Sequence, residues 1–350
     1  MRGGGAPGPD RAAAAVIPDA LRKARRPLCL GIGGGGDVVG ALATAEHCRL
    51  EYGARPVLGG VTWERRPIDP EPGPRKASEI EGARPIGPEA LLARPVLLAN
   101  AHTHVRSSGV RFAESRMAEL LGEETVLVDA NHGPAAIAVG LEDAAAALAC
   151  DLVVFVDVGG DVLAHGDEPG LASPLCDSVL LAAALHMAER SAQGVLGGAR
   201  DMAERPTPGV LCAVFGIGCD GELTPDEVLA RMDEVDERDG LLGRLPIDEP
   251  VARRLAEAVE AVPTEASALA LRAFRGESGL VEIRGGRRTV DLRPLAAATT
   301  FFDPVAAAAS AARLALPVRD APDLRAANEI LNSLGVRTEL DYENEMATSV

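Results

Sequence analysis

Short apolar runs alternate along the chain with longer stretches of helical pattern. The runs expected to form strands cover residues 28–32, 57–63, 96–99, 126–129, 152–157 and 210–217, and the clearest helical patterns cover residues 38–52, 134–149 and 173–190. Strands that alternate with helices are typical of parallel sheets, because parallel crossover connections place helices on the faces of the sheet. The pattern therefore predicts an α/β fold with a doubly wound, mostly parallel, Rossmann-like sheet.

Three segments interrupt this alternation. We expect residues 1–26 to form a flexible arm, residues 67–95 to form a Pro-rich excursion outside the sheet, and residues 225–291 to form an insertion of helices and a hairpin. The hairpin is expected near residues 280–291, where two β-rich runs flank Gly285 and Gly286. The rest of the chain, residues 27–345, is expected to form a single large α/β domain that includes these excursions.

Composition and charge narrow the class of protein. Hydrophobic residues make up 47% of the 350 residues but aromatic residues only 3%, so Ala, Val and Leu must build the core. The formal net charge of −17 is a poor match for a phosphate backbone or an anionic lipid surface. No run approaches the roughly 20 apolar residues of a membrane span, and the six cysteines show no CxxC spacing, as in reduced cytoplasmic proteins. We expect a cytoplasmic protein with a small anionic ligand and no nucleic-acid or membrane partner, and a homo-oligomer stays open.

Polar residues gather where the predicted strands end. They include Asp37, His102, His132, Asp157, Asp161 and His165. If all the strands are parallel, these ends meet at one edge of the sheet, where α/β proteins bind ligands. We therefore expect most of these six side chains to lie within roughly 10–12 Å of a common centre, the scale of a small-ligand cleft.

The loop after the fifth strand is the richest in ionisable groups. Oxygen-rich loops of this kind suit Mg²⁺ or Mn²⁺, and the expected metal ligands are Asp157, Asp161 and Asp167. The expected catalytic groups are His102, His132, Asp157 and His165, since an imidazole titrates near neutral pH and a carboxylate can act as acid or base. The alternative is structural, with the acids of the loop capping helices and satisfying backbone N–H groups.

A glycine run follows the first strand. Gly33, Gly34, Gly35, Gly36 and Asp37 stand directly before a predicted helix, so the backbone N–H groups and the helix N-terminus could hold a phosphate, a pyrophosphate or a carboxylate. The same glycines could simply form a tight turn. Gly31, Gly33 and Gly36 also match the G-x-G-x-x-G spacing of dinucleotide-binding proteins, but no clear acidic residue ends the second strand, Glu64 being the nearest.

Several motifs together resemble a known family. The segments GGGGD at residues 33–37, WER at residues 63–65 and VDVGGD at residues 156–161 are similar to domain of unknown function family 1152, as is DANHG at residues 129–133. The resemblance covers most of residues 27–345 and implies a single architecture. It assigns no catalytic residue.

The sequence favours an enzyme that acts on a nucleotide or another phosphorylated or carboxylated small molecule. Group transfer or hydrolysis, assisted by a divalent metal, is the expected chemistry, at the C-terminal edge of the sheet. One alternative is a protein that binds or senses such a molecule without catalysis. The other is an NAD-dependent oxidoreductase, which rests on the glycine spacing alone.

Overall fold

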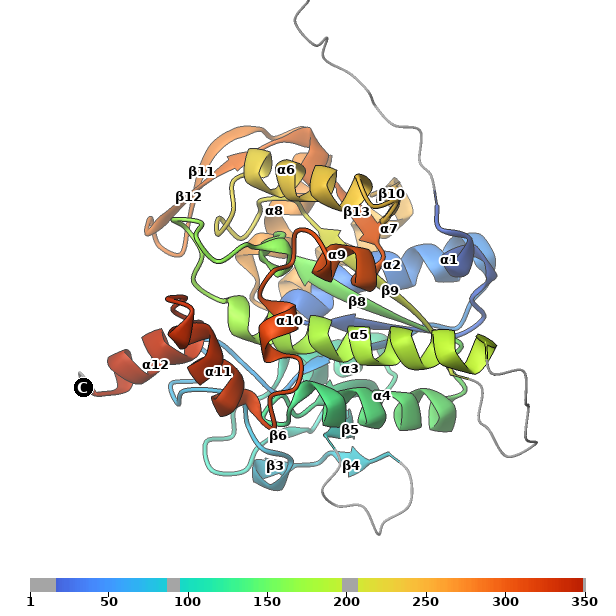
Figure 1. Cartoon of the computed structure of the whole chain (residues 1–350), viewed down its shortest axis with the longest axis vertical. Helices are drawn as coiled ribbons and strands as arrows, with labels where there is room; N and C mark the ends of the chain where they lie inside the picture. The colour runs from blue at the N-terminus through green and yellow to red at the C-terminus, as the bar shows by residue number, and fades with distance from the viewer. Residues whose placement is uncertain (1–16, 87–94, 197–206, 349–350) are drawn as a thin grey trace, which may run out of the picture.

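A nine-stranded sheet runs through the centre of the molecule in the computed structural model, which describes residues 17–86, 95–196 and 207–348 (Figure 1). From one edge to the other the strands are β10 (Leu241–Pro246), β13 (Ala298–Phe302), β9 (Gly209–Phe215), β8 (Leu152–Val158), β1 (Pro27–Gly31), β2 (Val57–Val61), β7 (Thr125–Val128), β5 (Val96–Ala99) and β4 (Arg84–Pro85). The fold is the expected α/β fold with a mostly parallel sheet, to which antiparallel strands are added.

The five central strands, from β9 to β7, are parallel, and antiparallel strands flank them on both sides. The chain passes from β1 to β2 and on to β7 in one direction. It then returns to the other side of β1 and adds β8 and β9. The strand order therefore reverses between β1 and β8, and the crevice beyond the carboxyl ends of two such strands is the usual ligand site of doubly wound sheets.

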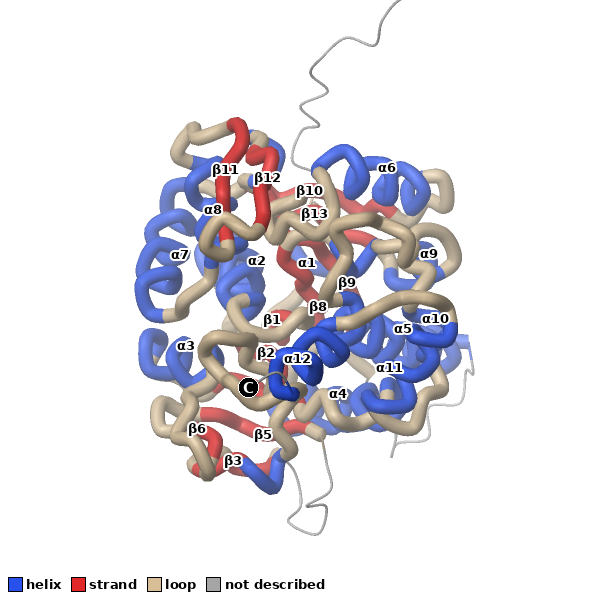
Figure 2. Tube along the Cα trace, turned by 90° about the vertical axis from the view of Figure 1, so that its left-hand side faces the viewer, coloured by secondary structure: helices blue, strands red, loops and turns tan. Residues whose placement is uncertain are grey.

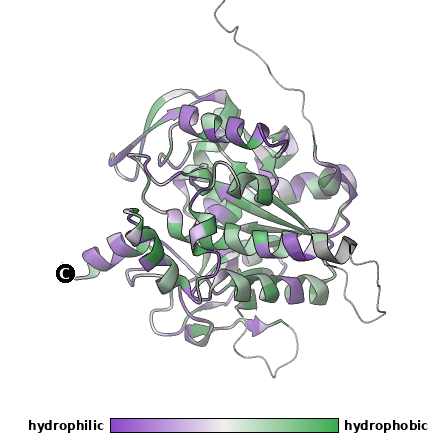
Figure 3. Cartoon of the chain, in the orientation of Figure 1, coloured by the Kyte–Doolittle hydropathy of each residue, from purple (hydrophilic) through white to green (hydrophobic). Residues whose placement is uncertain are grey.

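Helices cover both faces of the sheet (Figure 2). One face carries α2 (Asp37–Tyr52), α3 (Ala113–Leu121), α7 (Glu249–Ala261) and α8 (Glu265–Phe274), and the other carries α4 (Pro134–Leu148), α5 (Pro174–Leu196), α9 (Pro304–Ala308), α10 (Ala315–Val318) and α11 (Leu324–Ser333). Each face has its own apolar core, and β8 contributes Phe155 to one and Val154 to the other. Figure 3 shows the sheet as mainly hydrophobic, whereas α6 (Pro225–Asp236) and α12 (Glu339–Thr348) carry many hydrophilic residues.

The direction of β5 corrects the sequence-based expectation. The short apolar run of β5 was expected to be parallel to the others, but Ala99 at its end pairs with Thr125 at the start of β7. A run of four apolar residues encodes burial and not direction, so the sequence pattern does not reveal the reversal. The turn that follows β5 therefore lies at the edge of the sheet where the parallel strands begin.

The segments predicted as a flexible arm and as an excursion outside the sheet contain more regular structure than expected. Residues 1–16 and 87–94 lie outside the described residues, but residues 19–23 form helix α1 (Asp19–Lys23), whose Leu21 is fully buried. In the excursion, β4 adds to the edge of the main sheet, while β3 (Ile80–Glu81) pairs with β6 (His104–Val105) outside it. A backbone that runs along an exposed sheet edge can pair with it over two residues despite a high Pro content.

The insertion at residues 225–291 has two parts. The hairpin is confirmed, since β11 (Gly279–Ile283) and β12 (Arg288–Leu292) form a separate antiparallel pair. The strand β10 was not expected there, and it joins the main sheet antiparallel to β13. All six cysteines are buried and free of disulfides. Among the described residues, no helix combines the length and the apolar character that crossing a membrane needs.

Close packing of α2 against the sheet depends on a glycine. Residues 38–48 of this helix are all buried, and a Cβ atom on Gly40 would lie 2.4 Å from Val158 Cγ2 and 2.9 Å from Phe215 Cδ1. Alanine is favoured over glycine in helices by about 1 kcal/mol, but overpacking of a core typically costs about 1–3 kcal/mol. The site described below begins at the N-terminus of this helix.

We expect Gly40→Ala to lower the free energy of unfolding by about 1–2 kcal/mol, because the clash outweighs the gain in helix propensity. Urea denaturation followed by circular dichroism measures this change. A variant as stable as the wild type, or more stable, would show that α2 can move away from β8 at little cost.

Candidate functional site

Acidic side chains from four elements converge beyond the carboxyl ends of β1, β8 and β9. Asp37 is the first residue of α2, Asp157 is the penultimate residue of β8, and Asp161 begins the short 3-10 helix η3 (Asp161–Leu163). Asp177 lies in the first turn of α5, which packs on the same face of β8 as Phe155 and Asp157. The reversal of strand order between β1 and β8 brings these residues to one place.

The first group of carboxylates consists of Asp37, Asp157 and Asp177. One oxygen of each lies within 4.8 Å of an oxygen of the other two. Asp157 is 1% exposed and Asp177 is 2% exposed, yet Asp157 Oδ2 and Asp177 Oδ1 have no hydrogen-bond partner among the residues that the structure describes. Asp37 is only half-buried, and its Oδ2 accepts a hydrogen bond of 2.8 Å from the N–H group of Gly33.

The second group consists of Asp161, Asp220 and Glu222, which are all buried and meet the same 4.8 Å limit. Both carboxylate oxygens of Asp220 lack a hydrogen-bond partner within the described part of the chain. Glu222 is the satisfied member, because it accepts hydrogen bonds from the N–H groups of Ala172 and Ser173 and from Ser173 Oγ. Burial, followed by repulsion from Asp157 and Asp177, raises the pKa of Asp161, so the two groups adjoin.

Glycines make room for the carboxylates. A Cβ atom on Gly33 would lie 2.6 Å from Asp37 Oδ2 and 3.3 Å from both oxygens of Asp177. A Cβ atom on Gly159 would lie 2.2 Å from Asp220 Oδ1, and this glycine also has a φ of +127°. Neither position accepts a side chain without displacing an acidic group of the site.

The glycine loop is occupied largely by the protein itself. The N–H group of Gly33 donates to Asp37, and that of Gly35 donates to the carbonyl oxygen of Trp63. Gly36 lies under Thr264, the N-cap of α8, whose Cβ would be 2.3 Å from an added Cβ. The open side of the loop therefore faces carboxylates, so an anion would need a cation between itself and these residues.

Arginines lie at the margins of the site and are already paired. The Arg65 guanidinium stacks over the Trp63 ring, donates to the carbonyl oxygen of Gly33 and lies 3.3 Å from Glu339 Oε1. On the hairpin, Arg284 and Arg288 approach Glu222 Oε1 at 3.6 and 3.8 Å. The charges of these three arginines are thus shared with carboxylates of α12 and with Glu222.

Burial is the main cause of the pKa shifts in this cluster. It raises the pKa of Asp37 to about 7 and that of Asp220 to about 7. Burial, followed by repulsion from neighbouring carboxylates, raises the pKa of Asp157, Asp161 and Asp177 well above the usual range. Without a compensating cation, the cluster therefore holds protons at pH values at which an exposed aspartate has lost its proton.

The predicted histidines do not join the carboxylates. His102 follows β5 and so lies at the opposite edge of the sheet, as a result of the reversal of β5. His132 follows β7, which is three strand spacings or about 14 Å from β8, and its Nε2 lies 3.8 Å from Asp129 Oδ2. The structure therefore separates His102 from the edge of the sheet at which Asp37, Asp157 and Asp161 lie, and the histidines belong to neither group of carboxylates.

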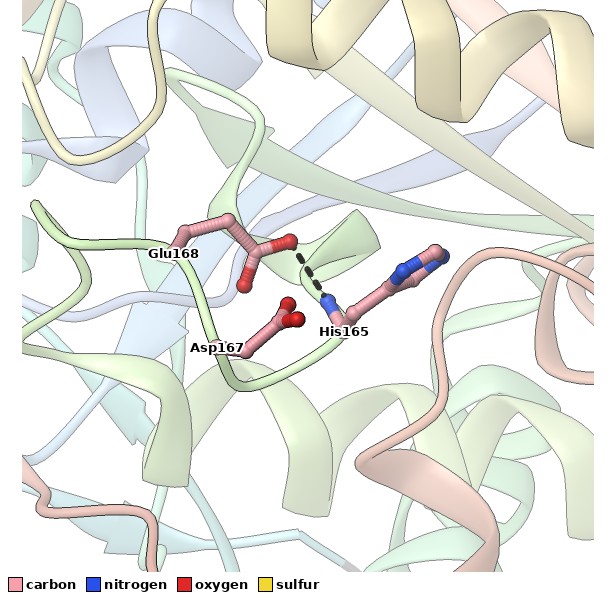
Figure 4. A group of neighbouring side chains, drawn as sticks. All are labelled: His165, Asp167 and Glu168. Carbon is pink, nitrogen blue, oxygen red and sulfur yellow. Dashed lines mark hydrogen bonds between the residues drawn. The ribbon is translucent and has the colours of Figure 1, made fainter.

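His165 and Asp167 belong to a separate local arrangement (Figure 4). Asp167 is exposed, and with His165 and Glu168 it forms a third group of possible ligands. Its neighbours are satisfied, because His165 Nε2 lies 3.0 Å from Glu234 and Glu168 accepts from the N–H groups of His165 and Gly166 and contacts Arg231. Through these contacts, His165 and Glu168 hold the loop after η3 in place.

Three important residues were not among the sequence-based candidates. The two groups are completed by Asp177, Asp220 and Glu222. Asp220 and Glu222 follow the sixth predicted strand, so their position at a strand end could have indicated them. The signal for Asp177 is a lone acidic residue in the otherwise apolar stretch PLCDSVLLAAAL at residues 174–185. An acidic residue at such a position has to be satisfied in the core, so it marks a site.

A cavity of the described residues lies away from these carboxylates. Its volume is about 420 Å³, and it opens near Arg26 and Val57, at the edge where β1 and β2 begin. Its charged lining residues have mixed sign, with Arg49 and Arg55 facing Glu123 and Glu124. None of the converging carboxylates lines it, so we place the candidate site at the carboxylates.

Comparison with known proteins gives one match. The family model described as "Protein of unknown function (DUF1152)" matches residues 28–347. No curated protein matches the chain, and no solved structure matches it.

The raised pKa values predict how stability depends on pH. A carboxyl group whose folded pKa exceeds its unfolded pKa makes the folded state bind more protons, so stability falls as the pH rises from about 4 to about 7. We expect the melting temperature in EDTA to fall by at least about 2 °C across this window. Differential scanning fluorimetry measures it.

Asp37→Asn is the matched variant for this experiment, since it removes one of the groups with a pKa of about 7. Its melting temperature should depend less on pH than that of the wild type. Equal pH dependence in both proteins would show that the fold does not raise the pKa of Asp37.

Proposed function

Because the chain belongs to the DUF1152 family, whose description names no activity, we propose its function from the site: a divalent-cation-dependent enzyme that acts on a nucleotide or another phosphorylated or carboxylated small molecule. Group transfer or hydrolysis is the proposed reaction class. The proposed cation is Mg²⁺ or Mn²⁺, held by Asp37, Asp157 and Asp177.

The observation that carries this proposal is the pair of buried carboxylate oxygens without a partner, Asp157 Oδ2 and Asp177 Oδ1. An uncompensated buried carboxylate costs several kcal/mol, so proteins pair such groups or use them to coordinate a metal. Three carboxylates with oxygens within 4.8 Å of one another fit the hard oxygen ligands that Mg²⁺ and Mn²⁺ prefer. Arg65 meets this need only in part: its charge acts on Asp37 and Asp177, but it is shared with Glu339 and Glu343.

The cation explains why an anionic ligand would bind to a protein with so many acidic residues. A bound divalent cation neutralises charge on an anionic substrate and polarises its bonds. Asp37 is half-buried and lies beside the half-buried Gly33, so the first group is reached from the side of the glycine loop. Substrate would enter there, with its anionic group towards the carboxylates.

In this proposal Asp157 is a ligand of the cation, and no carboxyl group of the cluster is assigned to proton transfer. The proposal gives no catalytic role to His102, His132 or His165 and no ligand role to Asp167, because their contacts lie outside the two groups of carboxylates.

The contacts of the glycine loop do not favour a dinucleotide. Thr264 covers Gly36 at the start of α2, where a pyrophosphate would have to approach the helix. Glu64, the nearest acidic residue to the end of β2, is buried and accepts a hydrogen bond from the N–H group of Ala113. It is therefore engaged in capping α3 and is not presented to a ribose.

A cytoplasmic location is part of the proposal. It rests on the six buried cysteines, which are free of disulfides. The net charge of −17 supports a small anionic ligand brought in with a cation, in preference to nucleic acid or an anionic membrane.

The test is a turnover screen of nucleotides, sugar phosphates and small carboxylates with Mn²⁺ or with EDTA, read by mass spectrometry. We expect at least one compound to be converted with Mn²⁺ only. Asp157→Asn should lower the rate by at least about 100-fold, since it removes a ligand of the cation, whereas loss of a residue that only supports a ligand lowers activity by about 10–100-fold. Asp167→Asn is the matched control and should keep the rate, because Asp167 is exposed and lies outside both groups.

The outcomes separate the candidate functions. A ligand that binds with Mn²⁺ but is never converted would support a sensor and contradict the proposed enzyme. Conversion that is unaffected by EDTA and by Asp157→Asn would contradict the proposed site.

A further inference from the structure

We propose that the site holds a second divalent cation, bound by Asp161, Asp220 and Glu222, so that the two groups of carboxylates form one two-cation centre. This inference rests on the proposed function, because the first cation is that held by Asp37, Asp157 and Asp177. It narrows the substrate class to compounds whose phosphoryl group can bridge two cations.

Asp220 is the observation that points to a ligand at the second position. The residue is 6% exposed, and neither of its carboxylate oxygens has a partner among the described residues. The missing side chain of Gly159 leaves room for this carboxylate, because a Cβ atom there would lie 2.2 Å from Asp220 Oδ1. The fold therefore makes space for a buried carboxylate whose oxygens make no hydrogen bond of ordinary geometry within the described residues.

The number of carboxyl groups also favours more than one cation. The two groups contribute six carboxyl groups, and Asp157 and Asp177 lie close enough to Asp161 for their charges to act on it. Two divalent cations would balance four of the six negative charges, whereas one would balance two.

The hairpin arginines do not replace the second cation. Arg284 and Arg288 approach Glu222, at 3.6 and 3.8 Å, and Arg288 also donates to the carbonyl oxygens of Gly170 and Gly221. Arg284 keeps 41% of its side chain exposed. It is therefore placed at the rim of the second group, where it can contact an outer oxygen of a phosphorylated substrate.

Paired cations about 3.5–4 Å apart stabilise both the entering and the leaving oxygen when a phosphoryl group is transferred. The first group is reached through the half-buried glycine loop, and the second lies under the hairpin. A phosphoryl group bound between them would contact both cations. This arrangement fits a phosphate ester or anhydride better than a simple carboxylate, which offers fewer oxygens to bridge two metals.

The experiment measures Mn²⁺ binding to the full-length protein by equilibrium dialysis and by electron paramagnetic resonance. We expect about two Mn²⁺ ions per wild-type chain and a spin-coupled spectrum, because ions about 3.5–4 Å apart interact magnetically. Asp220→Asn should bind about one ion and give the six-line spectrum of isolated Mn²⁺. Asp177→Asn should also lose one ion, and Asp167→Asn, the matched control, should keep both.

Other results would overturn the inference. One ion in the wild type, lost in Asp177→Asn and kept in Asp220→Asn, would leave the proposed function standing and remove the second cation. Two uncoupled ions, one of them lost in Asp167→Asn, would place the second ion at His165, Asp167 and Glu168. No bound Mn²⁺ at all would overturn both the inference and the proposed function. The wild-type spectrum needs no variant, so it decides the question even if a substituted chain fails to fold.

Discussion

Burial of uncompensated carboxylates is the constraint on which this structure depends. Asp157, Asp177 and Asp220 are at least nine-tenths buried and carry oxygens without partners. Removing a carboxylate from water costs several kcal/mol unless protons, donors or cations compensate it. The fold concentrates this cost at the reversal of strand order between β1 and β8. The connections that follow these two strands run in opposite directions, and they leave space for a ligand between them. A cation bound there would offset the cost of burying these carboxylates.

Distant parts of the chain hold the acidic site in place. Glu339, the first residue of α12, accepts hydrogen bonds from the N–H groups of Leu175 and Cys176 and thereby fixes the start of α5 next to Asp177. One turn later, Glu343 accepts from Trp63 Nε1 and from the N–H group of Gly73. The C-terminal helix thus ties α5 to the loop after β2. These contacts give a physical reason for a family match that extends to residue 347.

Local sequence pattern predicted the centre of the fold well and the site in part. The unbroken apolar run of β8 and the glycines after β1 indicated a buried parallel sheet with polar residues at its edge, and Asp37, Asp157 and Asp161 do lie together. The direction of β5 could not be predicted, because its apolar residues would be buried in either orientation. His102 was misplaced for that reason alone. Contacts such as that of Arg65 with Glu339 join residues 274 positions apart, and no local pattern encodes them.

The position of the cation is the most direct test of this account. A crystal grown with Mn²⁺ gives an anomalous difference map that locates the ion without reference to activity. We predict a peak among Asp37, Asp157 and Asp177, about 2.1–2.3 Å from their oxygens, close to the distances of other hard divalent cations. A map with no peak at these residues, in a crystal saturated with Mn²⁺, would contradict the account.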